Sequence, residues 1–372
     1  MTASTLFESS NINGMTLVNR FVRSATWEGM ATEDGRVTPK LIDTMVALAA
    51  GGIGLIISGH AYVAKNGQAS PWQLGIYDDS LIDGLKAMTD AVHAAGGRIV
   101  AQLAHAGHFA LEKAIGTPPV VVSDFDGLSQ APRTELSVAA IQLLKNDYVD
   151  AARRARTAGF DGIQLHSAHG YLLSQFLSPW FNRRSDDYGG TINNRVRIHA
   201  EIIRAIRKTV GTDYPILVKM NCEDFSEGGL TVAESIAAAG QMVSAGLDAI
   251  ELSGGLLTGG KLSPSRPNID KSEKEAYFKD AARAFKGEVD VPLILVGGIR
   301  SLDVAERLLD AGTADYFSMS RPLIREPGLI KRWQSGNRTR ARCLSDNLCF
   351  GPGLAGKGIY CVTEERIDQK MK

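Results

Sequence analysis

Two histidines and a tyrosine stand close together in the stretch IQLHSAHGYLLSQFLSPWFNRRSDDYGG, residues 163–190, where a short apolar run ends. His166, His169 and Tyr171 are poor choices for packing but suit a site that holds and protonates a ligand. A neutral imidazole N–H can polarise a carbonyl oxygen. A tyrosine, with an ordinary pKa of about 10, keeps a proton to donate at neutral pH. The three residues therefore predict an acid-assisted reduction or enolisation.

The same histidines could instead hold a metal ion. A catalytic zinc site needs a third protein ligand, and Glu223 or His105 is available for that role. Residue types alone leave both interpretations open, so we turn to the strands and helices that position the histidines.

Glycine pairs and an arginine in the second half of the chain predict a phosphate site. Gly254 and Gly255 follow one apolar run, Gly297 and Gly298 follow the next, and Arg321 follows a third. Glycine lets backbone N–H groups approach a phosphate closely, and arginine offers two parallel donors. The alternative is that these glycines only turn tight corners.

Short apolar runs alternate with amphipathic segments along most of the chain. Eight runs are predicted strands: 20–25, 54–60, 98–105, 161–168, 215–221, 248–255, 292–298 and 315–321. The segments between them include predicted helices at 39–50, 80–96, 140–159, 193–211, 231–246 and 301–312. This order predicts an α/β fold, a (β/α)8 TIM barrel. A doubly wound sheet is disfavoured because no G-x-G-x-x-G follows the first strand.

Two segments are expected to lie outside the repeating pattern. SSNINGMTLVN near the N-terminus contains an Asn-Gly pair and predicts a hairpin lid that closes the bottom of the barrel. From about residue 336 the pattern stops. We therefore expect a barrel domain at 1–335 and a short, irregular, cysteine-containing extension at 336–372.

Active sites of such barrels lie at the C-terminal ends of the strands. The candidate site residues are those at the strand ends and just beyond: Ala25, Thr26, Trp27, His60, Gln102, His166, His169, Tyr171, Lys219, Ser253, Gly254, Gly297, Gly298, Ser320 and Arg321. They are expected to form one ring of mostly hydrogen-bonding groups around the mouth.

Charge and composition narrow the class of partner. Lys plus Arg and Asp plus Glu each number 41, so no basic surface for nucleic acid or a membrane is predicted. The N-terminal segment has no apolar signal region, and no apolar run approaches the roughly 20 residues of a membrane span. A cytoplasmic protein that acts on a small molecule is expected, and homo-oligomerisation is left open.

The motifs resemble the old yellow enzyme family, the FMN-dependent ene-reductases, over nearly the whole barrel. The matching pieces are NRFVRSA at 19–25, AQLAHAG at 101–107, HSAHGYLLSQFLSP at 166–179, NRRSDDYGG at 182–190, VGG at 296–298 and MSRPLIREP at 319–327. The resemblance implies non-covalent FMN and NADH or NADPH as reductant. It also implies a substrate with an activated alkene (enone, enal or enoate) and a ping-pong hydride mechanism.

The resemblance also implies roles for single residues. Gln102 would bind the pyrimidine end of the flavin, and Lys219 would stand near its N1–C2 edge, where the family more commonly has arginine. His166 and His169 would hold the substrate carbonyl, and Tyr171 would protonate the α-carbon. The remaining cofactor-binding residues would line the flavin and its phosphate: Ala25, Thr26, Trp27, His60, Ser253, Gly254, Gly297, Gly298, Ser320 and Arg321.

One position in the flavin site departs from the family pattern. Trp27 stands where many relatives carry Thr or Cys near the flavin C4 carbonyl, which puts the flavin potential in question. Trp27 either borders the flavin or turns away and packs under the lid.

The extension carries three cysteines, Cys343, Cys349 and Cys361. The barrel is most similar to that of the 2,4-dienoyl-CoA reductase and trimethylamine dehydrogenase branch, whose cysteine cluster binds [4Fe–4S]. Here Asp346 stands where a further cysteine is expected, and four cysteines are the usual requirement. A metal-free remnant, an iron–sulfur centre and a zinc site are the three interpretations.

The predicted function is reduction of activated C=C bonds with NAD(P)H through FMN. Two alternatives remain from the sequence. One is a barrel subunit of a larger iron–sulfur flavoprotein that transfers electrons. The other is a flavin-free, metal-dependent barrel lyase that uses the histidines.

Overall fold

Eight parallel strands form a closed barrel in the computed structural model, which describes residues 5–371. The order β4-β3-β13-β12-β11-β10-β9-β6 is closed by pairing of β4 with β6. All eight strands coincide with predicted ones: β3 Phe21–Arg23, β4 Leu55–Ile57, β6 Ile99–Ala104, β9 Gly162–Ser167, β10 Ile216–Asn221, β11 Ala249–Ser253, β12 Leu293–Leu295 and β13 Tyr316–Met319. The predicted (β/α)8 barrel is confirmed.

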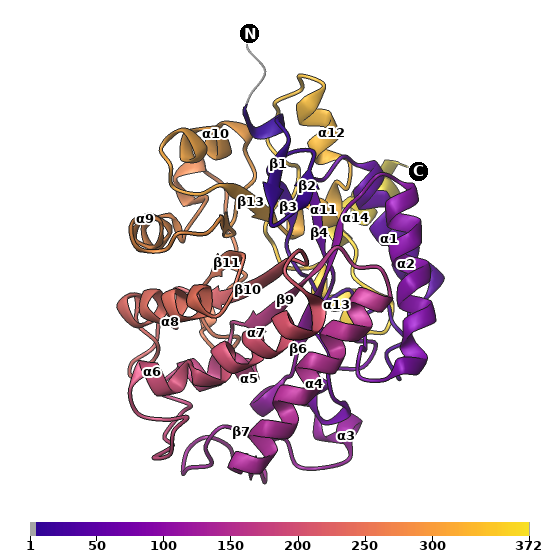
Figure 1. Ribbon diagram of the computed structural model, residues 1–372. Helices are drawn as coiled ribbons and strands as arrows, with labels where there is room; N and C mark the ends of the chain where they lie inside the picture. The colour runs from indigo at the N-terminus through magenta and orange to yellow at the C-terminus, as the bar shows by residue number, and fades with distance from the viewer. Residues whose placement is uncertain (1–4, 372) are drawn as a thin grey trace.

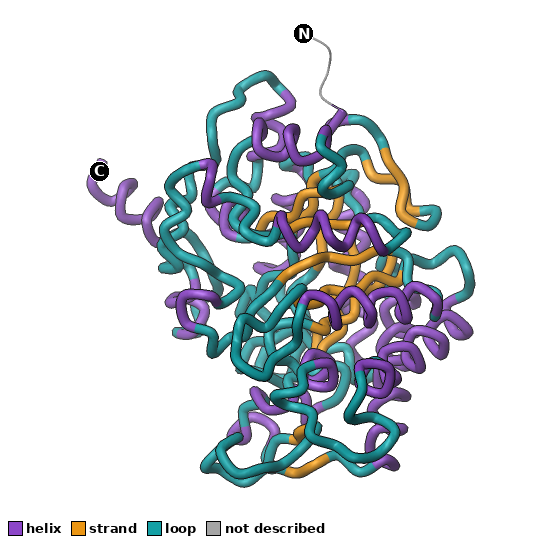
Figure 2. The backbone as a smooth tube through the Cα atoms, turned by 90° about the vertical axis from the view of Figure 1, so that its left-hand side faces the viewer, coloured by secondary structure: helices purple, strands orange, loops and turns teal. Residues whose placement is uncertain are grey.

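Helices surround the strands, which occupy the centre of the molecule (Figures 1 and 2). The helices that follow successive strands are α1 Pro39–Ala50, α2 Ile82–Ala94, α4 Val138–Thr157, α7 Arg197–Val210, α8 Val232–Ser244, α9 Lys279–Glu288 and α10 Leu302–Asp310, and α11 Arg321–Arg325 with α12 Leu329–Gln334 follows β13. Local signals begin several of them. Thr38 accepts a hydrogen bond from Leu41 N at the start of α1, and Thr231 with Glu234 forms a capping box on α8.

A hairpin of β1 (Ser10–Ile12) and β2 (Met15–Leu17) closes the N-terminal end of the barrel, as predicted. Asn13 and Gly14 at its turn have φ of 41° and 82°, the positive values that an Asn-Gly hairpin turn requires. Ile12, Met15 and Leu17 of the hairpin are buried. They pack on the apolar base of the barrel interior, which consists of Val22, Leu55, Ile57, Val100, Leu217, Ala249, Ile294 and Tyr316.

The extension packs along the barrel, and it lies beside α1 and α11 in yellow in Figure 1. Two helices interrupt a segment that was expected to be irregular: α13 Phe350–Leu354 and α14 Val362–Met371. Ile359 N donates to Glu28 O at 2.8 Å, and Arg325 Nε pairs with Glu364 at 2.5 Å. The extension therefore joins the loop after β3 to the helix after β13. Within residues 5–371, no helix has the length and apolar character needed to cross a membrane.

Candidate active site

The side chains that point into the barrel form three layers: an apolar base, a polar layer above it and the mouth. Successive strand residues point to opposite faces, so every second one faces the interior. On β10, Leu217 belongs to the base, Lys219 to the polar layer and Asn221 to the mouth. Neighbouring β11 repeats the order with Ala249, Glu251 and Ser253. The strands that build the core thus also place the polar groups.

The polar layer is centred on Glu251, which is fully buried. Its carboxylate accepts from Ser24 Oγ at 2.6 Å, Lys219 Nζ at 3.1 Å and Gln164 Nε2 at 3.0 Å. Burial opposes ionisation, but Lys219 and the hydrogen bonds outweigh it and hold the pKa of Glu251 below its ordinary value. Gln102 Nε2 donates to Gln164 Oε1 at 2.7 Å and joins the network. The amide of Gln102 and the ammonium of Lys219 are thereby fixed in orientation at the floor of the mouth.

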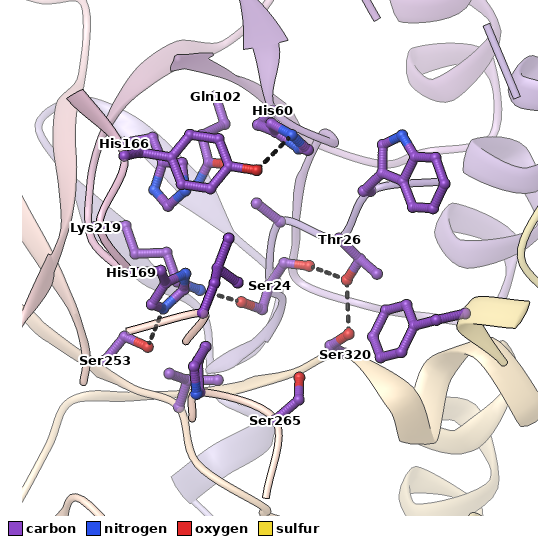
Figure 3. A pocket seen from close by; sticks show the side chains of 17 residues that line it. Ser24, Thr26, His60, Gln102, His166, His169, Lys219, Ser253, Ser265 and Ser320 are labelled. Atoms are coloured by element: carbon purple, nitrogen blue, oxygen red, sulfur yellow. Dashed lines mark hydrogen bonds between the residues drawn. The ribbon is translucent and has the colours of Figure 1, made fainter. Parts of the chain in front are cut away.

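His166 and His169 lie next to Gln102 and Lys219 of this layer (Figure 3), and their ring centroids are 5.4 Å apart. His169 has a φ of +66° and is held by hydrogen bonds from its backbone N to Asn221 and between its Nε2 and Ser253 Oγ, the latter at 2.8 Å. Among the described residues, no group hydrogen-bonds the His166 ring, and its Nδ1 is buried. Burial first, and then nearby positive charge, lowers the pKa of both rings well below 6.5. The two imidazoles are therefore neutral, and His166 keeps its hydrogen-bonding capacity for a ligand.

Tyr171 stands at the N-terminal end of α5 (Leu172–Leu177), with its ring centroid 4.5 Å from that of His166. Its hydroxyl lies 3.2 Å from His60 Nε2, the bond drawn at His60 in Figure 3. Burial raises the pKa of Tyr171 well above its ordinary value. The phenol therefore keeps its proton at neutral pH, beside two neutral imidazoles.

Most of the predicted site residues line one cavity: Ala25, Thr26, Trp27, His60, Gln102, His166, His169, Tyr171, Lys219, Ser253 and Ser320. Gly298 and Arg321 line a smaller cavity that shares Pro264, Ser265, Val296 and Ser320 with the first. Gly254 and Gly297 instead lie against Phe278, where an added Cβ would come within 2.8 and 3.1 Å of its ring. These two glycines permit close packing beneath the mouth.

Among the described residues, no third protein ligand completes a metal site with His166 and His169. His105 Nδ1 accepts from Gly107 N at 3.1 Å, and its Nε2 lies 3.2 Å from Asn66 Oδ1, so both ring nitrogens are engaged in loop packing. Within the described part of the chain, no three His, Cys, Asp or Glu residues are grouped so that they could hold a metal ion.

Comparison with known proteins decides the family. The model of the NADH:flavin oxidoreductase / NADH oxidase family matches residues 5–340. The chain belongs to this family. Among solved structures, an old yellow enzyme homologue from Zymomonas mobilis superposes with a TM-score of 0.76 at 28% identity, covering 90% of this chain and 94% of that one. The resemblance to old yellow enzymes is confirmed, and a flavin-free lyase is at odds with it.

Relatives within the family differ in length. An NADH oxidase from Thermoanaerobacter brockii is 37% identical over 93% of this chain and 53% of its own. A 4,4'-dithiodibutanoate disulfide reductase from Rhodococcus erythropolis is 32% identical over 97% of this chain and 96% of its own. The chain thus spans about half the length of the first of these relatives and nearly all of the second.

The site fits FMN, the cofactor that membership of this family implies. The adjoining cavities suit a ligand with a ring at one end and an anion at the other. Arg321, Ser320 and Gly298 would hold the phosphate, since a guanidinium, a hydroxyl and a glycine backbone are an anion-binding set. Gln102 and Lys219, fixed in orientation, would meet the polar edge of the ring.

Trp27 borders the cavity, as one expectation had it, and its ring packs on the extension rather than under the hairpin lid. It lines the cavity together with Phe350 of α13. Its ring lies so close to the backbone of Gly353 that a Cβ there would come within 2.9 Å. The Trp27 Nε1 is buried without a partner among the described residues. Phe350 was not predicted as a site residue, because a lone phenylalanine far from any barrel strand carries no local signal.

Among the described residues, the cysteines of the extension are not grouped with one another or with His, Asp or Glu so that they could hold a metal ion. Cys343 and Cys349 are buried and Cys361 is half-buried. Burial first, and then proximity of Cys343, raises the pKa of Cys349 to about 11, so its thiol is protonated at neutral pH when no metal is bound. Asp346 instead accepts hydrogen bonds from Thr363 Oγ1 at 2.6 Å and Leu348 N at 3.1 Å, and so stabilises the loop.

Proposed function

We propose that this protein reduces the C=C bond of an activated alkene, such as an enone, enal or enoate, with NADH or NADPH as the source of electrons. FMN, when bound, supplies the exchange of hydride with the nicotinamide and with the substrate. The observation that carries the proposal is the convergence of two neutral imidazoles and a protonated phenol on one cavity.

His166 and His169 bind the electron-withdrawing oxygen of the substrate. Each neutral ring can donate one N–H, and donors aimed at a developing oxyanion are more effective in a buried site than in water. His169 is held in a left-handed conformation by Asn221 and Ser253, so its ring direction is set before the substrate arrives. Negative charge that develops on the substrate oxygen is stabilised by these donors and by the nearby Lys219.

Tyr171 supplies the proton to the α-carbon. Its O–H bond breaks as the C–H bond forms, and the phenolate that remains is later reprotonated from water. The ring packs among Ala106, Ala110 and Phe109, which keep bulk water from competing as the donor.

Replacing Tyr171 by Phe tests this proposal. Because a positioned general acid typically contributes 10²- to 10⁴-fold, reoxidation of the reduced enzyme by cyclohexenone should slow by roughly 100-fold or more. Anaerobic stopped-flow absorbance separates this step from reduction by NAD(P)H, which needs no proton from Tyr171 and should change by less than about threefold. Equal losses in both half-reactions would contradict the role given to Tyr171.

Reduction of a small disulfide is a second candidate reaction. It is favoured by the disulfide reductase relative, whose length this chain matches almost fully. A disulfide is cleaved to thiols without protonation of carbon, so Y171F should retain most of this activity while losing alkene reduction. Turnover of both substrate classes by the wild type and Y171F distinguishes the two functions.

A further inference from the structure

His60 contacts the proposed proton donor in a way that the reaction as described does not use. It lies three residues beyond the last residue of β4, Ile57, and lines the cavity together with Tyr171. The rings meet edge to face, with an interplanar angle of 85° and centroids 5.3 Å apart. His60 Nε2 is the hydrogen-bond partner of the Tyr171 hydroxyl among the described residues, at 3.2 Å.

The backbone of His60 is held in place by a hydrogen bond from a buried side chain. Its backbone carbonyl accepts from Gln73 Nε2 at 3.1 Å, and Gln73 Oε1 accepts from Ala69 N at 2.7 Å. Gln73 is almost completely buried, so this brace is shielded from water. The imidazole therefore reaches Tyr171 from a rigid support.

The protonation state of His60 limits what it can do. Burial lowers the pKa of His60 to about 4, so the ring is neutral at physiological pH and one nitrogen carries a proton. If that proton is on Nε2, it is donated to the Tyr171 oxygen and leaves the phenolic proton free to point at the substrate. If Nε2 is bare, it accepts the phenolic proton and competes with the substrate for it. Only the first tautomer assists proton transfer.

The surroundings of Tyr171 make such a donor necessary. Transfer of its proton leaves a phenolate in a pocket lined by Ala106, Ala110 and Phe109, where an uncompensated charge is costly. A hydrogen bond to a charged acceptor is about twice as strong as one to a neutral acceptor. A donor at 3.2 Å therefore stabilises the phenolate more than the phenol, which lowers the barrier to proton transfer.

We infer that His60 is a positioning residue that donates its Nε2–H to the Tyr171 oxygen, directs the phenolic proton toward the substrate and stabilises the phenolate left behind. This inference rests on the proposed function, in which Tyr171 is the acid. His60 itself gives up no proton. The proton balance is unchanged: Tyr171 O–H to carbon, then water to phenolate.

Two substitutions at His60 test the inference in the FMN-loaded enzyme. H60L removes the donor, and enone-dependent reoxidation should slow roughly 10- to 100-fold. H60Q places an amide N–H near the former Nε2 and should restore most of that loss. The ratio of enone to quinone turnover is the second readout. It should fall in H60L because quinone reduction needs no protonation of carbon.

A double-mutant cycle decides whether His60 acts through Tyr171. If it does, adding H60L to Y171F should slow the enone reaction by less than about threefold, since effects of residues acting as a unit are not additive. A full additional loss would overturn the inference, as would an H60L enzyme with wild-type enone kinetics. Wild-type enone kinetics in Y171F would instead contradict the proposed function itself.

His108 provides a matched control. Its ring packs on Phe109, with centroids 5.1 Å apart, but does not hydrogen-bond Tyr171. H108L should keep the wild-type ratio of enone to quinone turnover. Flavin absorbance and thermal melting of each variant show whether FMN is retained and whether the fold is intact. If H60L does not fold, the kinetics of H60Q are compared with those of the wild type instead.

Discussion

At the scale of single residues, the neutrality of the histidine pair is the property with the most direct chemical consequence. Burial is the first cause of the lowered pKa of both His166 and His169, and the positive charge of Lys219 adds to it. An imidazolium pair would attract any anion, whereas two neutral donors select for an oxygen that becomes negative during the reaction.

A pH titration of ligand binding tests this neutrality. The affinity for an electron-poor phenol that stays ionised from pH 6 to 8 should vary by less than about threefold, because histidines with a pKa below this range do not change charge within it. Isothermal titration of the FMN-loaded protein measures it. A weakening of tenfold or more as the pH rises through 6.5 would show that the pair is charged on the acid side.

The sequence predicted the residues that lie on strands or directly after them. Gln102, His166 and Lys219 were found because period-two alternation and strand ends locate them without any tertiary information. Phe350 and Asn347 were not found. They reach the site only because the extension folds back onto the barrel, and no local pattern encodes that docking.

At the scale of elements, the extension contacts Arg321, the residue that would hold the phosphate of FMN. Asn347 Oδ1 accepts from Arg321 Nη1 at 2.5 Å, and its Nδ2 donates to Ser265 O at 2.8 Å. Asn347 thus orients the guanidinium and ties the loop after β11 to the same place. Its φ of 61° means that glycine can replace it without backbone strain.

Asn347→Gly should therefore weaken FMN binding without disturbing the fold. The loss of an orienting hydrogen bond to a charged group should raise the dissociation constant of FMN roughly tenfold. Quenching of flavin fluorescence by the apoprotein measures it. The matched control is Asn268→Gly, an exposed asparagine with a φ of 57° in the same region, which should bind FMN like the wild type. Equal affinity in both variants would show that Asn347 has no part in the phosphate site.

Among the helices, α9 was not identified from the pattern of apolar residues in the sequence. Lys279–Glu288 is short and mostly polar and buries Ala282 and Phe285, so few apolar residues mark it in the sequence. The barrel pattern still required an element there, because parallel neighbours such as β11 and β12 need a crossover. The order of strands in the barrel thus predicted a helix at this place, which the residue pattern alone did not identify.

At the scale of the whole molecule, buried histidines make stability depend on pH. Burial lowers the pKa of His60 to about 4 and those of His105 and His199 to about 3, and His166 and His169 shift in the same direction. In the unfolded chain their pKa is about 6.5. Below that pH the unfolded chain binds protons that the folded protein excludes, so stability is complete above about pH 7 and falls as the pH falls.

Urea unfolding of the FMN-free protein should show this loss. Each of the five histidines that stays neutral in the fold should cost about 2 kcal/mol between pH 7 and 5, so the total should approach about 10 kcal/mol. Circular dichroism at both pH values gives the free energy of unfolding. In His199→Gln the difference between the two pH values should shrink by about 2 kcal/mol. An unfolding free energy that is the same at both pH values would contradict the prediction.

Closure of the barrel joins the two ends of a long chain, because β13 pairs with β3, Phe317 beside Phe21. During synthesis at roughly 5–20 residues per second, β3 waits on the order of 15–60 s before its second neighbour has been made. For that time one edge of β3 lacks its native partner, and unpaired strand edges are sites of aggregation. We therefore expect the yield of folded protein to depend on translation speed and chaperone supply as well as on the final stability.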